Sequence, residues 1–486
     1  MLCCCQRENQ ADLETVGKRE HSLAGELKAF YNTGMLALYA VFCPVADFFG
    51  YAFVLTGLNL SLNEKKFLMT ENSNNPLRVA VIGAGVRGTS LARKLSSSEF
   101  RAEVVAVAEP DEEKRKSFAG EFRLNKTATY HDWEDLTEKL VGCDAAIIAT
   151  LDNQHKGPAI ASLERGWHIL MEKPLADNFN DCELILRTQK ERQKVVAVCH
   201  TLRFMDGFRK VKQISESGVI GQLVHIDNME AIGHFRFAHN YVRGKWAKEE
   251  RNTFLLLHKC SHDIDFINWL FREPCLRVSS FGSLKYFTPA NAPEGSTHRC
   301  TEGCSVRDTC PYSALLIYIN APLDEWPARD ICTVHTKEEH LKALKYGPYG
   351  ICVWHHDNDV VDHQVVMMEF EGGATANCTL SGYSATNGRR IRLQGTQGEM
   401  LFDEAAGTIL TKRFAQQHED LIRIEAPESY HPEDQDIVNN WISSVIFSTS
   451  VAVDAGEALR THAVVFAAEL SRKEKRTVEM SELIGN

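Results

Sequence analysis

The chain has 486 residues, a length that accommodates two or three domains, each with its own core. Its hydrophobic fraction of 44% and charged fraction of 24% are ordinary for a soluble globular protein, and a net charge of −11 without a long basic stripe argues against a nucleic-acid partner. The 15 cysteines stand mostly alone in apolar or helical runs, so they indicate small core residues in a reducing compartment, and we expect a cytoplasmic protein without a disulfide framework.

The first 75 residues form an extension ahead of the first predicted domain. Residues 35–60 are mostly apolar and long enough to span a bilayer, but Pro44 and Asp47 lie near their middle, and an acid inside a membrane is costly. The apolar run begins too late for a secretory signal, and early acidic residues disfavour a transit peptide. The extension is therefore left open between a membrane tether through residues 35–60, a surface helical pair and a disordered segment.

A G-x-G-x-x-G motif follows an apolar, β-type run at residues 79–88. Residues 78–82 fit a buried parallel strand, and residues 89–97 fit the helix after it. In such a turn the first glycine makes the tight bend, the second lets the backbone approach a pyrophosphate, and the third lets the helix pack close to the strand, while the positive helix N-terminus faces the phosphates. The motif therefore predicts dinucleotide binding by Gly83, Gly85, Val86, Arg87 and Gly88.

Glu109 ends the next apolar run, residues 104–108, and stands 21 residues after Gly88. An acidic side chain at this distance hydrogen-bonds to the ribose hydroxyls of a dinucleotide and repels the 2′-phosphate of NADP, so it favours NAD. Arg87 and Arg115 keep NADP open as an alternative. The alternative to a cofactor site is a plain strand-turn-helix whose glycines serve packing and whose Glu109 is a solvated strand end.

From Leu77 onward, short apolar strands alternate with helical patterns up to about residue 200. This alternation predicts a doubly wound, parallel α/β domain over residues 76–200, whose ligands bind at the carboxyl ends of the strands. The predicted strands are 78–82, 104–108, 144–149, 168–171 and 195–199, and the predicted helices are 89–97, 112–122, 157–165 and 180–193. The strand ends carry polar or glycine residues, namely Gly83, Glu109, Thr150, Lys173 and His200.

Lys173 follows the fourth of these strands and is held between Glu172 and Pro174. Next to an oxidised nicotinamide ring the pKa of a lysine falls, because two cations repel. A lysine with a lowered pKa can take the proton of a substrate hydroxyl and return it. The sequence thus indicates Lys173 as a catalytic acid/base, and the alternative is a surface lysine after a strand.

The combination of motifs resembles one known family. Glu172-Lys173-Pro174 after a G-x-G-x-x-G domain looks like the glucose–fructose oxidoreductase, inositol dehydrogenase and rhizopine catabolism (Gfo/Idh/MocA) family, and the resemblance covers about residues 76–475. Further matching stretches are 149–155 (its Ala-Thr-Pro-Asn-x-x-His loop), 200–204 (its domain-crossing segment), 261–265 (the histidine motif of its substrate domain), and 371–376 and 393–399 (hairpins of its open sheet).

The resemblance implies a nicotinamide-binding Rossmann domain followed by an α+β domain, here residues 201–486, with a large, mainly antiparallel open sheet that packs against partners in dimers or tetramers. It implies that Lys173 and His262 are catalytic. The cofactor site is expected to include Thr150, His155 and Glu172 besides the glycine loop and Glu109. The substrate site is expected to include Lys173, Arg203, His258, Lys259, Asp265 and Tyr349.

This chain departs from the family's pattern within these motifs. The dehydrogenases usually carry Asp four residues before the catalytic histidine, where this chain has His258. The two positions still share a helix face, but a histidine cannot hold the same negative charge, so the proton relay or the anchoring of a substrate hydroxyl is expected to differ. The alternative for His258 is a hydrogen-bonded histidine at a helix N-terminus. In the 149–155 loop, Leu151 replaces proline and Asp152 replaces asparagine.

An insertion at about residues 288–326 carries a histidine and three cysteines. Zinc needs four N/S ligands and would stabilise a loop too poor in apolar residues to fold alone. Cys300, Cys304 and Cys310 are therefore a candidate zinc site, although their spacing is not that of a standard zinc finger or zinc ribbon. No familiar spacing favours an iron–sulfur cluster, and the alternative is a loop with buried thiols. Residues 345–359 mix aromatic and hydrogen-bonding groups as carbohydrate sites do, which places Tyr349 in the expected substrate site.

The residues and the resemblance together predict an NAD(P)-dependent oxidoreductase. It would move a hydride between nicotinamide and a carbon of a sugar, sugar acid or cyclitol, and work as a homodimer or homotetramer. Two alternatives stay open. One is an NAD-assisted glycosidase or lyase on the same fold, in which transient oxidation serves bond cleavage. The other is a non-catalytic sugar or NAD sensor, against which the presence of Lys173 and His262 counts.

Overall fold

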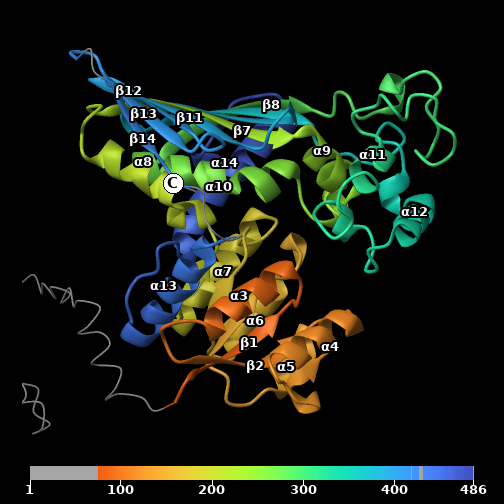
Figure 1. Ribbon diagram of the computed structural model, residues 1–486. Coiled ribbons are helices and arrows are strands. Elements are labelled where there is room, and N and C mark those ends of the chain that lie inside the picture. Colours follow the sequence, from red (N-terminus) through yellow and green to blue (C-terminus); the bar gives the residue numbers. More distant parts are fainter. Residues whose placement is uncertain (1–74, 417–418, 426–430, 485–486) are drawn as a thin grey trace, which may run out of the picture. The chain divides into compact units, whose positions relative to one another are not determined.

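The computed structural model describes residues 75–416, 419–425 and 431–484, which all belong to one compact unit (Figure 1). Apart from Asn75, the N-terminal extension and its apolar segment at residues 35–60 lie outside the described residues. Within the described ranges, no helix has both the length and the apolar character needed to cross a membrane.

The first part of the described chain folds into a six-stranded sheet whose strands are all parallel. The strand order is β3-β2-β1-β4-β5-β6, so the direction of winding reverses between β1 and β4. In an open α/β sheet of this kind, ligands bind beyond the carboxyl ends of the strands at that reversal. The predicted doubly wound sheet is thereby confirmed. Its strands are β1 (Leu77–Ile82), β2 (Ala102–Ala108), β3 (Thr129–Tyr130), β4 (Ala145–Ile148), β5 (His168–Met171) and β6 (Val196–Val198).

Successive residues of the central strand β1 face two separate apolar cores. Val79 and Val81 belong to one core, and Ala80 and Ile82 to the other, as expected for a strand that is covered on both faces. The helix after β1 buries residues at the spacing i, i+3, i+4 and i+7, which lays one apolar stripe on the sheet. The helices are α3 (Val86–Ser96), α4 (Glu112–Glu121), α5 (Trp133–Lys139), α6 (Lys156–Glu164), α7 (Phe179–Arg192) and, from much later in the chain, α13 (Glu433–Phe447).

A second sheet of nine strands follows, in the order β14-β13-β12-β11-β7-β10-β9-β8-β15. Neighbouring strands are antiparallel except for β7 and β10, which run parallel, so the predicted mainly antiparallel sheet is confirmed. The strands are β7 (Leu223–Gly233), β8 (Cys275–Ser283), β9 (His363–Phe370), β10 (Thr375–Ser384), β11 (Gly388–Gly395), β12 (Gly398–Asp403), β13 (Thr408–Arg413), β14 (Glu419–Arg423) and β15 (Val478–Glu479).

Three helices cover one face of the second sheet and leave the other face open (Figure 1). They are α8 (Asp206–Glu216), α10 (Leu255–Phe271) and α14 (Ala455–Glu474). Strands β7, β9 and β10 alternate between buried and accessible residues, which is the pattern of a sheet packed on one side only. The open face carries exposed large apolar side chains, namely Met229, Phe281, Met367, Leu401 and Leu421.

The segment between β8 and β9, residues 284–362, forms a separate lobe beside the sheet (Figure 1). It contains the helices α11 (Ala314–Tyr318) and α12 (Lys337–Tyr346), and it lies next to α9 (His234–Phe237). The lobe has a small apolar core made of Cys300, Ala314, Tyr318 and Leu344, of which Leu344 lies outside the predicted insertion at about residues 288–326. The last helix is α15 (Ser481–Ile484).

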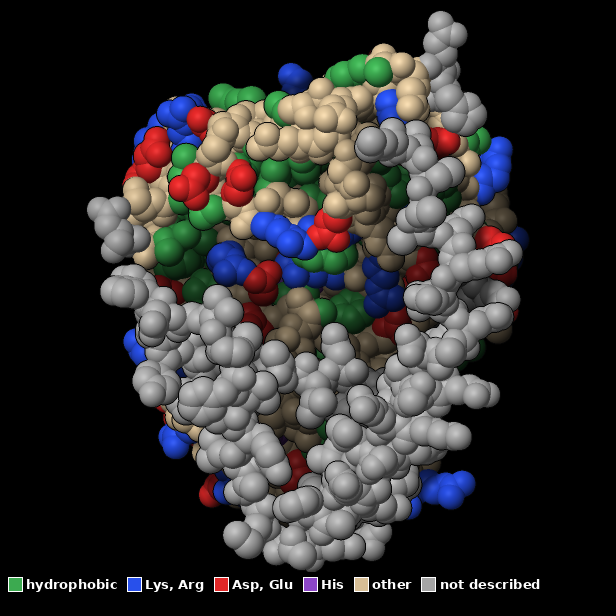
Figure 2. All heavy atoms as spheres, turned by 90° about the vertical axis from the view of Figure 1, so that its left-hand side faces the viewer, with side chains coloured by type: hydrophobic (Ala, Val, Ile, Leu, Met, Phe, Trp, Pro, Cys, Tyr) green, Lys and Arg blue, Asp and Glu red, His purple; other side chains and the backbone are tan. Residues whose placement is uncertain are grey.

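Charges of both signs share the face that Figure 2 shows. Where described atoms are visible in Figure 2, Lys and Arg side chains are intermixed with Asp and Glu side chains.

Candidate active site

The three glycines of the loop after β1 have different surroundings. Gly83 has a φ of +94°, and a Cβ there would lie 2.5 Å from the carbonyl oxygen of Ala149. A Cβ on Gly88 would overlap the carbonyl oxygen of Gly83, so this glycine lets α3 pack against the loop. A Cβ on Gly85 would meet nothing within 4 Å. The loop therefore has a tight turn, a close helix contact and open space between them, which are the features that a bound pyrophosphate requires.

Helix α3 begins at Val86, three residues earlier than predicted, with Gly85 as its N-cap residue. No side chain of the described residues caps this helix, and Val86 itself is exposed. The positive N-terminus of α3 is thus left to face the open space at Gly85, where it would stabilise a phosphate group. The surroundings of Gly85 fit a dinucleotide.

Glu109 lies at the end of β2, buried beside the glycine loop. Its carboxylate accepts hydrogen bonds from the backbone N–H groups of Ala84 (2.8 Å) and Asp111 (3.1 Å), so it fixes the loop conformation. Arg115 donates to the backbone carbonyl of Glu109, so this guanidinium also lies at the end of β2.

Arg87 is committed to ion pairs at the start of α3. Its Nε donates to Glu172 at 2.8 Å, and its two terminal nitrogens donate to both carboxylate oxygens of Asp434, at 2.7 and 2.9 Å. A guanidinium that is paired in this way has few donors left for a 2′-phosphate. The predicted cofactor residues Arg87 and Glu172 therefore contact each other, and α13 supplies the third partner.

Lys173 stands two residues after the end of β5, at the carboxyl end of the sheet. Its ammonium group donates to the backbone carbonyl of His258 on α10, so it bridges the first sheet and the helix layer of the second. Burial lowers the pKa of Lys173, and the nearby carboxylates of Asp152 and Glu172 oppose that shift. A lysine with a lowered pKa is the kind that can exchange a proton with a substrate hydroxyl.

His155 holds the loop that carries Lys173. The residue is fully buried, and its Nδ1 lies 2.5 Å from the carbonyl oxygen of Pro174. Thr150, at the end of β4, has its hydroxyl 3.5 Å from the carbonyl oxygen of Leu151. Thr150 follows the end of β4, whereas His155 is the N-cap residue of α6 and contacts the backbone after Lys173.

Helix α10 presents His258, Lys259 and His262 in its first turns. Nδ1 of His258 lies 2.7 Å from Oδ2 of Asp152, and Lys259 forms an ion pair with Glu230 of β7 at 2.7 Å. The ring of His262 lies edge-on to His200, with the ring centres 5.6 Å apart. The structure thus brings both histidines of the predicted motif to the side of α10 that meets Lys173.

Burial governs the protonation of the two α10 histidines. It lowers the pKa of His258 to about 4, with a contribution from the charge on Lys173. It lowers the pKa of His262 well below its ordinary value, again with help from Lys173. Both imidazoles are therefore neutral near neutral pH.

Asp152 was not among the predicted site residues. Burial would raise the pKa of this carboxyl, but the neighbouring His258 and Lys173 outweigh burial and hold it well below its usual range. Its backbone N–H also donates to the side chain of Asn252 at 3.1 Å. One signal in the sequence could have found it, since Asp152 replaces the family's asparagine in the same chain in which His258 replaces the family's aspartate.

Arg203, Asp265 and Tyr349 of the predicted substrate site are engaged elsewhere. Arg203 donates two hydrogen bonds of 2.8 Å to the carboxylate of Asp265, and both side chains are buried. This pair joins the domain-crossing segment to α10. Tyr349, in the lobe between β8 and β9, stacks on His239 with ring centres 4.9 Å apart.

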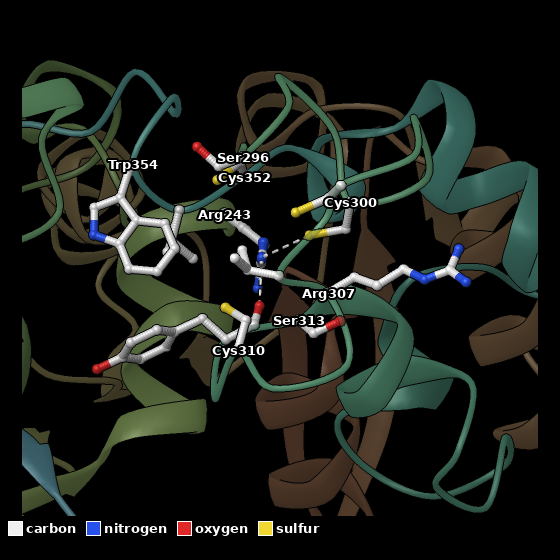
Figure 3. Close-up of a pocket in the computed structure, with 12 residues that line it drawn as sticks. Arg243, Ser296, Cys300, Arg307, Cys310, Ser313, Cys352 and Trp354 are labelled. Carbon is white, nitrogen blue, oxygen red and sulfur yellow. Dashed lines mark hydrogen bonds between the residues drawn. The ribbon is translucent and has the colours of Figure 1, made fainter. Parts of the chain in front are cut away.

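The three cysteines of the candidate zinc site line one cavity together with Cys352 (Figure 3). Figure 3 shows the guanidinium of Arg243 directed at the sulfur of Cys300, and the two atoms are 3.8 Å apart. Because that guanidinium is a cation, it disfavours a metal ion beside the same sulfur. In the part of the chain that the structure describes, no three His, Cys, Asp or Glu side chains are arranged to hold a metal ion, and the described cysteines are free.

Two family models match most of the described chain. The model of the oxidoreductase family, NAD-binding Rossmann fold, matches residues 77–200, and the model of the same family's C-terminal alpha/beta domain matches residues 212–480. Among curated proteins, the chain is 31% identical over 194 residues to 2,7-anhydro-N-acetylneuraminate hydratase of Mediterraneibacter gnavus, which is 39% of this chain and 48% of that protein. It is 26% identical over 199 residues to inositol 2-dehydrogenase of Salmonella typhimurium, or 40% of this chain and 55% of that protein. The matches thus span about half the length of these relatives.

Solved structures share the fold. Levoglucosan dehydrogenase in complex with NADH superimposes with a TM-score of 0.63 at 16% identity, over 84% of this chain and 99% of that one. An oxidoreductase from Agrobacterium radiobacter in complex with NAD+, L-tartaric acid and magnesium gives a TM-score of 0.62 at 16% identity, over 84% and 100% of the two chains. With both family models matched in order along the chain, this protein belongs to the Gfo/Idh/MocA oxidoreductase family.

Proposed function

We propose that the protein is an NAD(H)-dependent oxidoreductase that acts on a CH–OH group of a sugar, sugar acid or cyclitol. The observation that carries this proposal is the placement of Lys173. Its ammonium group donates a hydrogen bond to the carbonyl of His258 on α10, and burial lowers its pKa. Lys173 follows β5, which only β4 separates from β1, the strand before the glycine loop. A proton acceptor at the carboxyl end of a dinucleotide-binding sheet is what the oxidation of an alcohol needs.

NAD is proposed as the cofactor rather than NADP. Glu109 places a negative charge at the end of β2, which disfavours a 2′-phosphate, and the ion pairs of Arg87 occupy its guanidinium. Arg115 leaves NADP as a weaker alternative. When bound, the nicotinamide accepts or donates the hydride, while the residues of this chain handle the proton.

In the oxidation direction the neutral amine of Lys173 takes the proton of the substrate hydroxyl. His262, which is neutral because burial lowers its pKa, orients the same hydroxyl by accepting or donating a hydrogen bond. The substrate class rests on the names of similar proteins, which include inositol 2-dehydrogenase and levoglucosan dehydrogenase. These proteins act on polyhydroxylated rings, and the site proposed here has several buried polar groups suited to such rings.

The test is an NADH-monitored screen of the purified protein over sugars, sugar acids and cyclitols, preceded by extraction of any bound nucleotide. Lys173→Ala is expected to abolish turnover while NADH affinity, measured by fluorescence titration, changes less than about threefold, because the lysine acts on the proton. Lys190→Ala, an exposed lysine of α7, is the matched control and should leave both quantities unchanged. Full activity of the Lys173→Ala protein would refute this mechanism.

A redox-assisted bond cleavage is the second candidate. It is favoured by one comparison, the similarity to a protein named 2,7-anhydro-N-acetylneuraminate hydratase. Under this alternative, an anhydro-sugar or glycoside is consumed without net formation of NADH. The same samples therefore decide between the two candidates when product formation is followed by mass spectrometry beside the NADH signal.

Assembly and location are proposed on separate grounds. The open face of the second sheet exposes Met229, Phe281, Met367, Leu401 and Leu421, and we propose that it buries these side chains against a second copy in a homodimer or homotetramer. The free state of the described cysteines suits a reducing compartment, so a cytoplasmic location is proposed.

A further inference from the structure

Two positions of the site differ from the family's pattern, and they contact each other. The family's asparagine is replaced by Asp152 and its aspartate by His258. These residues are 106 positions apart in the sequence, yet Nδ1 of His258 lies 2.7 Å from Oδ2 of Asp152. The family's pattern places a carboxylate at the position of His258 on α10. In this chain the carboxylate of the pair belongs instead to Asp152, which follows β4.

The geometry fixes the state of the imidazole. A carboxylate is an acceptor only, so Nδ1 of His258 carries the hydrogen and donates it to Asp152, while Nε2 keeps its lone pair. The ring also packs against Trp246, whose ring centre is 4.5 Å away, and against Tyr241 at 5.9 Å. The His258 side chain remains 15% exposed, so the ring is neither free to turn nor sealed from the site.

The charges around the pair favour this arrangement. The groups that act on His258 are Asp152, Lys173 and its helix neighbour Lys259, and those that act on Lys173 are Asp152, Glu172, Lys259 and Arg87. Lys259 is neutralised by Glu230, and Arg87 by Glu172 and Asp434. Asp152 is thus the carboxylate that acts on both Lys173 and His258.

We propose that His258 is a second proton acceptor of the reaction and that Asp152 is the positioning residue that fixes its tautomer and compensates its charge. The inference rests on the proposed oxidoreductase function. NAD+, when bound, would take up the hydride of the substrate carbon, and the hydroxyl proton passes to the amine of Lys173. Nε2 of His258 then receives that proton, directly or through one water, and becomes an imidazolium paired with the Asp152 carboxylate. Release of the proton to solvent restores neutral His258 and neutral Lys173. An Asp–His pair that orients an imidazole and stabilises its cation has the same roles in serine hydrolases.

The decisive variants exchange the two side chains. Asp152→Asn is expected to lower kcat about 10–100-fold, while KM and NADH affinity stay within about threefold of the wild type. Loss of the carboxylate that orients a functional histidine typically lowers activity by about this factor. His258→Asp alone sets two carboxylates against each other and should be at least as damaging. The double variant Asp152→Asn/His258→Asp restores the family's pattern and is expected to recover activity above either single variant. Asp324→Asn, an exposed aspartate of the lobe, is the matched control and should behave as the wild type.

The pH profile separates a positioning role from a loss of structure. The charge of Asp152 raises the pKa of Lys173, so in Asp152→Asn the rising limb of kcat/KM against pH should move to lower pH. In the double variant the carboxylate is back and the limb should return. A merely misfolded variant loses amplitude without moving the limb.

Nitrogen NMR of histidine-labelled protein gives a readout without turnover. The wild type should show His258, identified by its absence in His258→Gln, with hydrogen on Nδ1, and Asp152→Asn should shift it towards the Nε2–H tautomer. Wild-type kcat and pH profile in Asp152→Asn, or hydrogen on Nε2 in the wild type, would overturn the relay. A wild type without NAD-linked turnover on any substrate refutes the proposed function itself, so the two failures are distinguishable.

Discussion

The contrasting surroundings of the loop glycines make a stringent test of the cofactor site. Gly85→Ala adds a methyl group in open space, at a backbone conformation (φ −71°, ψ −170°) that alanine also adopts. Alanine is a poorer N-cap than glycine but restricts the unfolded chain, so the two effects offset each other to within about 1 kcal/mol. Gly88→Ala instead drives a methyl group into the carbonyl of Gly83, and overpacking of this kind costs about 1–3 kcal/mol.

These magnitudes predict a dissociation of stability from binding. At roughly 2–4 °C per kcal/mol, Gly88→Ala should lower the melting temperature by several degrees, while Gly85→Ala should leave it nearly unchanged. Gly85→Ala should nevertheless weaken NADH at least tenfold, because its methyl group occupies the space where the pyrophosphate approaches. Differential scanning fluorimetry and NADH fluorescence titration measure the two quantities on the same samples. If Gly85→Ala binds NADH like the wild type, the loop does not hold a pyrophosphate and the reasoning fails.

Three further predictions concern the core, pH and assembly. Trp441→Ala, at a fully buried residue of α13, should cost about 3–5 kcal/mol in thermal or urea unfolding, and a loss below about 1 kcal/mol would contradict its place in the core. Burial lowers the pKa of His258 to about 4 and that of His462 to about 3, so the folded state favours the neutral form of both residues. Their contribution to the free energy of unfolding is complete above the unfolded pKa of about 6.5. It is lost as the pH falls towards about 4, by roughly 3 kcal/mol for each histidine. Urea unfolding at about pH 7 and pH 4.5 checks this, and equal stability at both would be the contrary result. The double change Phe281→Asp/Met367→Asp on the open sheet face should convert an oligomer to a monomer in analytical ultracentrifugation. A wild-type protein that is already monomeric would contradict the proposed interface between copies.

Much of the first sheet could be predicted because its signals are local. Strand β5 has the predicted bounds, residues 168–171, since an apolar run between polar residues defines a buried strand. Helix α3 starts three residues before the prediction because Gly85 caps it without a side chain, so no Ser, Thr or Asp marks the start. The lobe between β8 and β9 was harder, since its core joins Cys300, Tyr318 and Leu344, which share no periodic pattern.

The site shows the same division between local and distant information. Lys173, His258 and His262 stand in short motifs, and these motifs made them candidates for the site. Asp152 was missed because its contact with His258 crosses 106 residues, and a single sequence does not report such a pairing. The zinc hypothesis used the spacing of three cysteines, whereas the cation that approaches Cys300 belongs to Arg243, which comes from outside that motif.

The nucleotide-binding sheet is completed by residues from near the end of the described chain. Trp441 and Ile442 of α13 belong to one of its cores, and Val453 and Ala458 to the other. The N–H of Val198 in the last strand of that sheet donates to the carbonyl of Val453 at 3.0 Å. A ribosome therefore has to synthesise nearly the whole second sheet before the first can close its cores. No single cut in the chain yields a nucleotide-binding half with its cores intact, and an excised version has to carry residues 433–458 as a graft.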